Sequence, residues 1–357
     1  MKGLLNFYKG KKILITGHTG FKGSWLTHLL LESGAKVKGY SKAPNTNPSL
    51  FDLLKLSTKI DSCLEDINDY SRLEKEILDF QPDFIFHMAA QPLVRYSYLN
   101  SVETHQTNII GTANVLEISR KVNNKCIIVC ITTDKVYKNK EWKYPYTEKD
   151  ELGGYDPYSS SKAAAELIIS SYRESYFKKS NIQVASARAG NVIGGGDWSL
   201  DRLVPDLVKS VEAKQKLILR NPNSIRPWQH VLDPLFAYLK LGMLMSISED
   251  EFDQPWNFGP KNNQEISVLD VMKIFYETYE LPLNYEINNL GQPHEAGILK
   301  LDISKASKFM NWIPIFDTRM AIKRTALWYK LFSEGESAIE LVNNDIKIYL
   351  NYNETDL

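Results

Sequence analysis

The 357-residue sequence has only three cysteines, and this scarcity argues against two kinds of architecture. Cys126 and Cys130 lie in one apolar run, and an odd total does not favour a disulfide framework. No second pair has the spacing of metal ligands, so no metal site is expected. Free thiols are typical of a reducing compartment, and we predict a cytoplasmic protein.

Charge of one sign and long apolar runs are also lacking. The 43 basic and 43 acidic residues give a formal net charge of +0, so no nucleic acid is expected as a partner. The most apolar stretch, residues 231–247, is interrupted by Asp233, Pro234 and Lys240, and the first ten residues lack the apolar core of a signal peptide. The sequence therefore predicts no membrane association.

What the sequence does contain is an alternation of short apolar runs and helical patterns. The predicted strands are residues 12–16, 36–40, 83–88, 126–132 and 182–187. The predicted helices between them are residues 21–33, 69–80, 100–121 and 158–176. This order is typical of an α/β protein with a doubly wound parallel sheet of the Rossmann type.

The rhythm breaks near residue 191, where glycine and proline become frequent. We therefore predict a dinucleotide-binding domain over 1–190 and a smaller substrate-binding lobe, mainly over 191–330. Some later segments, at about 227–260, are expected to pack back on the first domain. A helical tail is expected over 331–357.

Three glycines, Gly17, Gly20 and Gly23, lie between the first predicted strand and the first predicted helix. Glycines let the backbone approach a pyrophosphate, and the helix N-terminus offers free N–H groups, here those of Phe21 and Lys22. This context indicates dinucleotide binding. The acid expected about 20 positions on is absent, and Ser41-Lys42 stands there, which leaves NAD and NADP both open.

Two side chains on the helix predicted over 158–176 suggest a catalytic pair. Tyr158 and Lys162 are spaced i, i+4 and share one helix face. A nearby ammonium group lowers the pKa of a phenol, so we expect Tyr158 to serve as a base for a hydroxyl proton. An ordinary amphipathic helix could carry the same spacing, but its position after a glycine loop and the Thr132-Thr133 strand end favours catalysis.

These motifs resemble the extended short-chain dehydrogenase/reductase family of NAD(P)-dependent epimerases and dehydratases. Within it, the chain is similar to the 4,6-dehydratases that act on CDP-glucose, and the resemblance runs from about residue 10 to about residue 330. The matching stretches are residues 17–25, 89–95, 132–137, 188–198, 201–206 and 226–232.

The resemblance implies a reaction in three steps, used in deoxysugar and O-antigen-type polysaccharide biosynthesis. Tyr158 takes the C4 hydroxyl proton while C4 gives a hydride to NAD. Water is then lost across C5 and C6, and the hydride returns to C6, giving CDP-4-keto-6-deoxyglucose. The catalytic residues that it implies are Thr133, Asp134, Lys135, Tyr158 and Lys162.

The resemblance also implies two sets of binding residues. The cofactor-binding set is Gly17, Thr19, Gly20, Phe21, Lys22, Gly23, Asp66, Ile67, Ala89, Ala90, Asn108, Tyr158 and Lys162. The substrate-binding set is Asn191, Arg202, Arg220, Arg226 and His230, and the pair at 294–295, His294-Glu295, is a further candidate. Planar guanidinium groups suit a diphosphate, although a single arginine is more often an ion-pair partner on a surface. Asp66 could accept a hydrogen bond from adenine or simply be an acid at a helix N-terminus.

One position departs from the dehydratases that act on dTDP-glucose. Those enzymes carry Thr-Asp-Glu where this chain has Thr133-Asp134-Lys135. Asp134 would be the acid for the departing C6 hydroxyl. Lys135 would have to be neutral to take the C5 proton, or it is a solvated lysine at a strand end, so the C5 base is open.

Two rival functions remain. A nucleotide-sugar 4-epimerase would share Tyr158 and Lys162 but would not need the Asp134-Lys135 pair. A non-catalytic NAD-binding regulator would keep the glycine loop alone. We also expect a homodimer that pairs through the helices predicted over 100–121 and 158–176, where Ala163, Ala164 and Ala165 would allow close approach.

Overall fold

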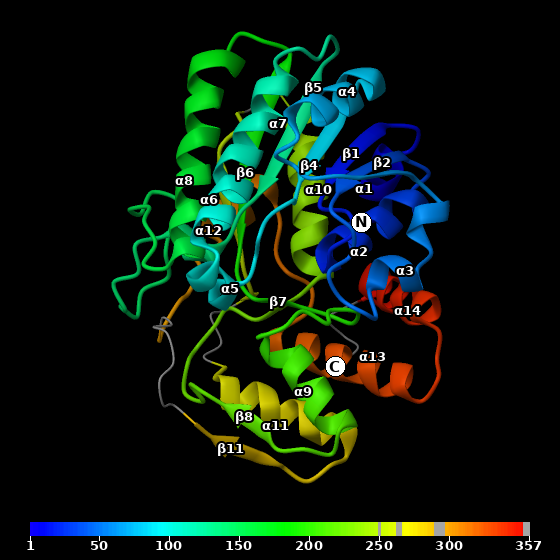
Figure 1. Ribbon diagram of the computed structural model, residues 1–357, viewed down its shortest axis with the longest axis vertical. Helices are drawn as coiled ribbons and strands as arrows, with labels where there is room; N and C mark the ends of the chain where they lie inside the picture. Colours follow the sequence, from blue (N-terminus) through cyan, green and yellow to red (C-terminus); the bar gives the residue numbers. More distant parts are fainter. Residues whose placement is uncertain (249–250, 262–265, 289–296, 353–357) are drawn as a thin grey trace.

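The computed structural model describes residues 1–248, 251–261, 266–288 and 297–352. Its centre is a sheet of seven strands in the order β10-β6-β5-β4-β1-β2-β3, and every neighbouring pair is parallel (Figure 1). The strands of this sheet are β1 (Lys12–Thr16), β2 (Lys36–Ser41), β3 (Asp61–Leu64), β4 (Phe84–His87), β5 (Cys126–Ile131), β6 (Ile182–Ala189) and β10 (Pro255–Phe258). This arrangement confirms the predicted doubly wound parallel sheet.

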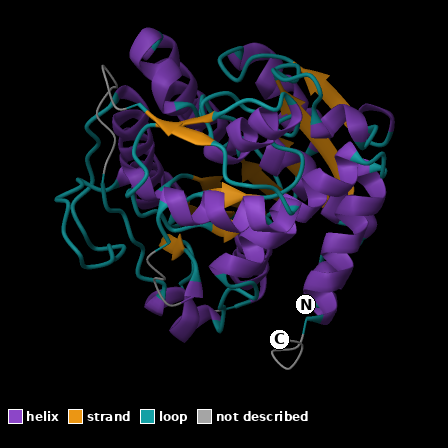
Figure 2. Ribbon diagram, turned by 90° about the horizontal axis from the view of Figure 1, so that it is seen from below, coloured by secondary structure: helices purple, strands orange, loops and turns teal. Residues whose placement is uncertain are grey.

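Helices cover both faces of the sheet, as the view from below in Figure 2 shows. Those of the first half of the chain are α1 (Lys2–Phe7), α2 (Phe21–Glu32), α3 (Leu50–Leu53), η1 (Leu56–Thr58), α4 (Tyr70–Phe80), α5 (Val94–Leu99), α6 (Ser101–His105), η2 (Gln106–Ile110), α7 (Gly111–Ser119), η3 (Asp134–Val136), α8 (Pro157–Tyr172) and η4 (Arg173–Phe177). The later helices are α9 (Leu203–Glu212), α10 (Leu232–Ile247), α11 (Val268–Tyr279), α12 (Ser304–Met310), α13 (Thr318–Ser333) and α14 (Ala338–Asn351).

The alternation of side chains along each strand divides the core into two layers. On one face, Ile13 and Ile15 of β1 pack with the apolar side chains of α2 and α10. On the other face, Leu14 of the same strand packs with those of α4, α7 and α8. Because both faces are buried, these strands are nearly continuous apolar runs, which is why the sequence revealed them.

Two small parallel sheets belong to the second half of the chain. One pairs β8 (Leu217–Leu219) with β11 (Tyr285–Ile287), and the other pairs β7 (Val192–Ile193) with β9 (Gln229–His230). In Figure 1, α9, α11, β8 and β11 form a lobe below the sheet. The strands β6 and β7 run from the sheet towards this lobe, so the carboxyl ends of the parallel strands face it.

The structure departs from the predicted elements at two strands and two helices. The sheet includes β10, which the pattern did not indicate, and β3, which is largely exposed. The helix expected over 100–121 is divided by the π-helical segment η2, and the one expected over 158–176 ends in the π-helical segment η4. The division of the chain into domains at residue 190 stays a prediction.

The glycine-rich turn after β7 joins the two halves of the molecule. The indole N–H of Trp25 in α2 donates to the Gly195 carbonyl at 2.9 Å. A Cβ atom at Gly195 would lie 1.9 Å from Cδ2 of Trp328 in α13. The backbone at Gly195 is therefore wedged between α2 and α13 and has no room for a side chain.

We predict that Gly195→Ala lowers the free energy of unfolding by about 1–3 kcal/mol, the usual cost of overpacking a core. Chemical denaturation monitored by tryptophan fluorescence measures this change. Gly3→Ala is the matched control, because nothing lies within 4 Å of a Cβ atom there. Equal stabilities of the two variants would contradict the prediction.

Candidate active site

The glycine loop reaches its position because β1 and β4 are neighbours in the sheet. Gly17 has a φ of +76°, and a Cβ atom there would lie 2.7 Å from the backbone nitrogen of Ala89, just after β4. A Cβ atom at Gly23 would lie 2.1 Å from the Gly17 carbonyl oxygen. Only glycine fits at these two positions. The order of the strands along the sheet reverses between β1 and β4. Open α/β sheets bind their ligands at the carboxyl ends of the strands at such a point.

The first turn of α2 forms a cradle of backbone N–H groups. Gly20 is its N-cap, and no side chain caps this end of the helix. A Cβ atom at Gly20 would meet nothing closer than the Gly17 carbonyl oxygen at 3.5 Å. Uncapped N–H groups at Phe21 and Lys22 and the absence of side-chain bulk fit the pyrophosphate of a dinucleotide.

The end of β2 shows how the adenosine side of this cradle is built. Thr19 Oγ lies 2.9 Å from Ser41 Oγ and donates to the Lys42 carbonyl at 2.8 Å. Lys42 Nζ lies 2.8 Å from Asp66 Oδ2. Partial burial would raise the pKa of Asp66, but the Lys42 ammonium outweighs it and holds this pKa below its usual range. Ile67 is buried, with Gly111 packed against its side chain.

Asn108 lies in the π-helical segment η2 and links two parts of the site. Its Oδ1 accepts the Gln91 N–H at 2.8 Å, and its Nδ2 donates to the Gln91 carbonyl and to Ser161 Oγ at 3.1 and 2.8 Å. It therefore holds the loop after Ala89 and Ala90 against α8. The geometry shows a positioning role for Asn108, and contact with a cofactor stays a prediction.

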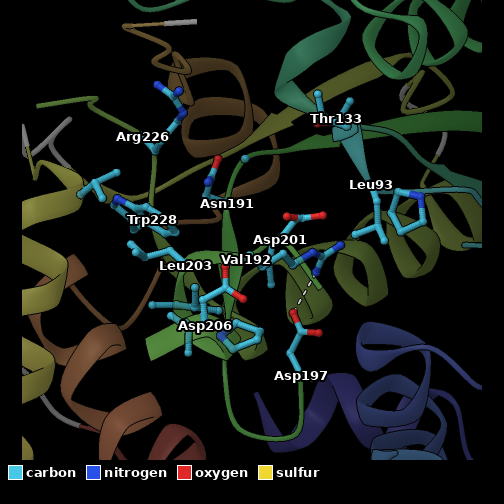
Figure 3. A pocket seen from close by; sticks show the side chains of 18 of the residues that line it. Leu93, Thr133, Asn191, Val192, Asp197, Asp201, Leu203, Asp206, Arg226 and Trp228 are labelled. Atoms are coloured by element: carbon cyan, nitrogen blue, oxygen red, sulfur yellow. Dashed lines mark hydrogen bonds and ion pairs between the residues drawn. The ribbon is translucent and has the colours of Figure 1, made fainter. Parts of the chain in front are cut away.

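A cavity opens at the carboxyl ends of the strands, beside this cradle (Figure 3). It brings together ten of the residues that the sequence singled out: Phe21, Lys22, Thr133, Asp134, Lys135, Tyr158, Asn191, Arg202, Arg220 and Arg226. In Figure 3, Leu93 and Thr133 lie across the cavity from Arg226 and Trp228. The cofactor cradle, the strand ends and the lobe thus share one cavity.

Tyr158 is placed by the way in which α8 begins. The Asp156 carboxylate caps the helix by accepting the Ser159 N–H at 2.9 Å, and Pro157 occupies the first turn. The Tyr158 N–H donates to Ser97 Oγ of α5 at 3.1 Å. These contacts fix the first turn of α8 at the cavity.

The expectation that Lys162 lowers the pKa of Tyr158 is wrong. Burial raises the pKa of Tyr158 to about 12, and a hydrogen bond with the Thr133 side chain only partly opposes this shift. Lys162 is not among the groups that lower this pKa, and its ammonium donates to the Ile131 carbonyl at 3.1 Å. Burial also lowers the pKa of Lys162 to about 8. The i, i+4 spacing gave the right helix face but not the solvation of the groups.

Asp134 is the buried carboxyl group of the cavity. Thr133 Oγ donates to its Oδ1 at 2.9 Å, while its Oδ2 is buried and has no hydrogen-bond partner. Burial raises the pKa of Asp134, although Lys135, Thr133 and Arg226 act in the opposite direction. A raised pKa makes the protonated form more accessible than it is in water, so this carboxyl group is suited to donate a proton. Lys135 lies at the same cavity wall.

The cations of the lobe differ in how they are held. The buried Arg226 donates to the carbonyls of Ile225 and Gly297 at 3.0 and 3.1 Å. Arg202 pairs with Asp197 at 2.8 Å, as the dashed line in Figure 3 shows.

A further pair, which sequence reasoning missed, crosses the cavity mouth. Arg95 donates to Asp201 Oδ1 at 2.9 Å, and Arg220 approaches the same oxygen at 3.8 Å. Arg95 and Asp201 are contributed by distant parts of the sequence, so their pairing had no local signal. Both residues stand within stretches that carry the family resemblance.

His230 is not part of the cavity, which corrects its assignment to the substrate site. It is fully buried at the end of β9, where its ring packs edge-on against Trp25 and Phe316. Its Nε2 lies 3.8 Å from Asp345 Oδ2, and burial lowers its pKa to about 3. The imidazole is therefore a neutral core group. The His294-Glu295 candidate lies outside the described residues.

Two kinds of feature are absent from the part of the chain that the structure describes. No group of three or more His, Cys, Asp and Glu side chains there could hold a metal ion. No helix in that part of the chain is long and apolar enough to cross a membrane.

The protein has a dinucleotide-binding fold with an adjoining polar cavity, as epimerases and dehydratases have. The features that define it are the parallel sheet, the glycine cradle and this cavity. The sequence model of the GDP-mannose 4,6 dehydratase family matches residues 14–325. The chain belongs to this family.

Individual relatives agree with this membership. The chain is 43% identical over 351 residues to CDP-glucose 4,6-dehydratase of Salmonella typhimurium, covering 97% of this chain and 98% of the relative. It is 25% identical to dTDP-glucose 4,6-dehydratase of the same organism, over 89% of this chain and 92% of the relative. The solved structure of dTDP-glucose 4,6-dehydratase from Bacillus anthracis in complex with NAD shares the fold, with a TM-score of 0.75, 23% identity and coverage of 91% and 98%.

We predict that Asp134→Asn stabilises the fold at neutral pH while lowering turnover. A carboxyl group whose pKa is higher in the folded than in the unfolded protein disfavours folding once the pH exceeds its pKa in the unfolded chain. This effect is complete when the pH is above its pKa in the folded protein. The stability gain should therefore be present at pH 7 and absent in acid. Urea denaturation at several pH values measures it.

The matched control is Asp79→Asn, at an exposed position on α4. This control should change neither stability nor turnover. If Asp134→Asn is less stable than the wild type at pH 7, the carboxyl group is not held in an unfavourable setting.

Proposed function

We propose that this protein is a CDP-glucose 4,6-dehydratase, which converts CDP-D-glucose to CDP-4-keto-6-deoxy-D-glucose and water in deoxysugar biosynthesis. The identity of 43% over nearly the whole of both chains supports the substrate. The observation that carries the chemistry is Asp134, a buried carboxyl group with an unpartnered oxygen in the same cavity as Tyr158. An elimination needs such an acid, whereas epimerisation does not.

The cofactor in this proposal is NAD, held by the cradle of Gly17, Gly20 and Gly23 at the start of α2. Family relatives solved with NAD support this choice. When bound, NAD supplies a reversible hydride acceptor for C4 of the sugar. NADP is the alternative, because Ser41 and Lys42 stand at the end of β2. Comparing the affinities of the protein for NAD and NADP decides between them.

The side chains of the cavity then have separate roles. Tyr158 takes the proton of the C4 hydroxyl, with Lys162 one turn away on the same helix. Asp134 gives its proton to the departing C6 hydroxyl, and Thr133 orients it through the 2.9 Å hydrogen bond. Lys135, on the same wall, takes the C5 proton.

The nucleotide end of the substrate is assigned to the lobe. Arg226 lies across the cavity from Thr133, and Asn191, Arg202 and Arg220 also line the cavity. Guanidinium groups donate in pairs to phosphate oxygens, so this side suits the diphosphate. The sugar then points towards Asp134 and Tyr158.

The test is turnover of CDP-, dTDP-, UDP- and GDP-glucose, with the product identified by NMR. We expect the 4-keto-6-deoxy product from CDP-glucose most efficiently. CDP-glucose carrying deuterium at C4 should give product labelled at C6, with solvent hydrogen at C5 and no net consumption of NAD.

Two outcomes would point elsewhere. CDP-galactose as product would identify a 4-epimerase. This is the second candidate, because solved structures that share the fold include UDP-glucose 4-epimerase of Thermotoga maritima. Binding of NAD without turnover of any of the four sugars would favour a non-catalytic regulator.

We predict that Tyr158→Phe lowers turnover by about a hundredfold or more while leaving NAD affinity within about twofold. The substitution removes only the phenolic oxygen, and general acid–base groups contribute rates of this size. Steady-state kinetics and a fluorescence titration with NAD separate the two effects. Activity close to that of the wild type would remove Tyr158 from the proposed role.

We also propose a homodimer in the cytoplasm, paired through α6, η2, α7 and α8. Apolar side chains are exposed along these helices and their ends: Leu99, Val102, Ile110, Leu167 and Tyr176. Exposed apolar groups gathered on neighbouring helices are typical of an interface between subunits. A second copy would cover them.

We predict that Leu167→Asp shifts the protein towards a monomer at micromolar concentration, because a charge would be buried at the interface. Sedimentation velocity measures the change. Ile313→Asp, at another exposed apolar position, should sediment as the wild type. A wild-type protein that is already monomeric would reject this pairing.

A further inference from the structure

Lys22 is the second residue of α2, and its side chain does not point away into solvent. It lines the cavity together with Asp134, Tyr158 and Arg202. The sequence suggested only that its backbone N–H serves a dinucleotide. Its ammonium group therefore lies at the boundary between the cofactor cradle and the substrate cavity.

The other cations near Lys22 already have polar partners within the protein. Lys162 donates to the Ile131 carbonyl at 3.1 Å, and Arg202 pairs with Asp197 at 2.8 Å. Among the described residues, no hydrogen bond or ion pair joins the Lys22 ammonium to another side chain or carbonyl. A cavity-lining ammonium without a partner costs free energy unless a ligand completes its contacts.

The charges around Lys22 favour an anion. Burial, together with the neighbouring Lys162 and Arg202, lowers the pKa of Lys22 to about 7, while Asp134 and Asp197 act in the opposite direction. Asp197 is already engaged by Arg202, and burial raises the pKa of Asp134. Three cationic side chains, Lys22, Lys162 and Arg202, thus converge at this part of the cavity.

We propose that the Lys22 ammonium binds a phosphate oxygen of a diphosphate ligand in the cavity. Two sources offer this chemistry: the pyrophosphate of a dinucleotide on the first turn of α2, and the diphosphate of a nucleotide sugar. The naming of these two sources rests on the proposed function, whereas the anion-binding role rests on the position and partners of Lys22.

The proposal has a consequence for protons. A phosphate contact favours the charged amine, so binding raises the pKa of Lys22 from its value in the free protein. Below pH 7 the amine is already protonated and binding takes up no proton. Above pH 7, and up to the pKa of the complex, binding takes up part of a proton, and the affinity falls as the pH rises.

The experiment uses the full-length protein freed of nucleotide, titrated calorimetrically with NAD alone and with CDP alone. Each titration is run at pH 8 in two buffers of different ionisation enthalpy, which gives the number of protons taken up. The variants are Lys22→Met, which removes the charge at similar length, and Lys22→Arg, which keeps it. Lys59→Met, at an exposed position directly after η1, is the matched control.

We expect Lys22→Met to weaken one or both ligands by about tenfold or more, the size of a charge-assisted hydrogen bond, and to abolish proton uptake. Lys22→Arg should keep most of the affinity, and Lys59→Met should equal the wild type. If only the affinity for NAD falls, the pyrophosphate is the group that Lys22 binds. If only the affinity for CDP falls, that group is the diphosphate of the nucleotide sugar.

Unchanged affinities for both ligands in Lys22→Met would overturn the proposal. The proposal would also be overturned if Lys22→Met and Lys22→Arg lost affinity equally and the wild type took up no proton on binding. Thermal unfolding of each variant establishes that it is folded, and Lys22→Arg provides the comparison if Lys22→Met is not. Because only binding is measured, the result is separate from the identity of the reaction product.

Discussion

The buried carboxylate of Glu166 is the contact on which the arrangement of the site depends. It accepts hydrogen bonds from Thr132 Oγ at 2.6 Å, Ser186 Oγ at 2.8 Å and Arg188 Nη2 at 2.7 Å. Burial alone would raise the pKa of Glu166, but Arg188 and the two hydroxyl groups keep it below its usual value. The carboxylate is therefore ionised, and it ties α8 to the ends of β5 and β6.

This network extends beyond the ion pair. Arg188 also donates to Tyr137 Oη at 2.9 Å, and Tyr137 donates to Asn257 Oδ1 of β10 at 2.6 Å. Removing one member of a buried pair typically costs about 3–5 kcal/mol, because the other charge is left without compensation. Since Glu166 is one turn after Lys162, and Thr132 precedes Thr133 and Asp134, the pair also sets the distance between the two walls of the cavity.

The sequence revealed most of the sheet and the cofactor loop because both follow local rules. Strands that are buried on both faces are apolar runs, and the close approach of Gly17 to Ala89 requires glycine. It did not reveal β3, where only Cys63 is buried, or β10, a four-residue edge strand that begins with proline. The two π-helical segments lie within continuous helical runs, and no residue type there marks the change of hydrogen-bond pattern.

Side-chain environments were harder to predict than positions. His230 stands within a stretch that carries the family resemblance, yet the packing of Trp25, Phe316 and α14 around it removes it from the cavity. The spacing of Tyr158 and Lys162 predicts nearness but not solvation, which decides the sign of the pKa shift. Lys22 was noticed for its backbone alone, because nothing in a glycine motif indicates where the side chain beside it points.

The same reasoning explains how one fold can serve both dehydratases and epimerases. Oxidation at C4 needs only the cofactor cradle and the Tyr158 helix, which the sheet and Glu166 hold in place. Elimination also needs a group that gives a proton to the departing hydroxyl, the role proposed for Asp134, whose pKa is raised by burial. A Cβ atom at Gly190 would lie 2.2 Å from Cγ of Pro227 and 3.1 Å from Asp134 Oδ2, so glycine keeps the backbone close against this carboxyl group. The close packing of Gly190 and Pro227 helps to bury Asp134, and this burial raises the pKa of the carboxyl group.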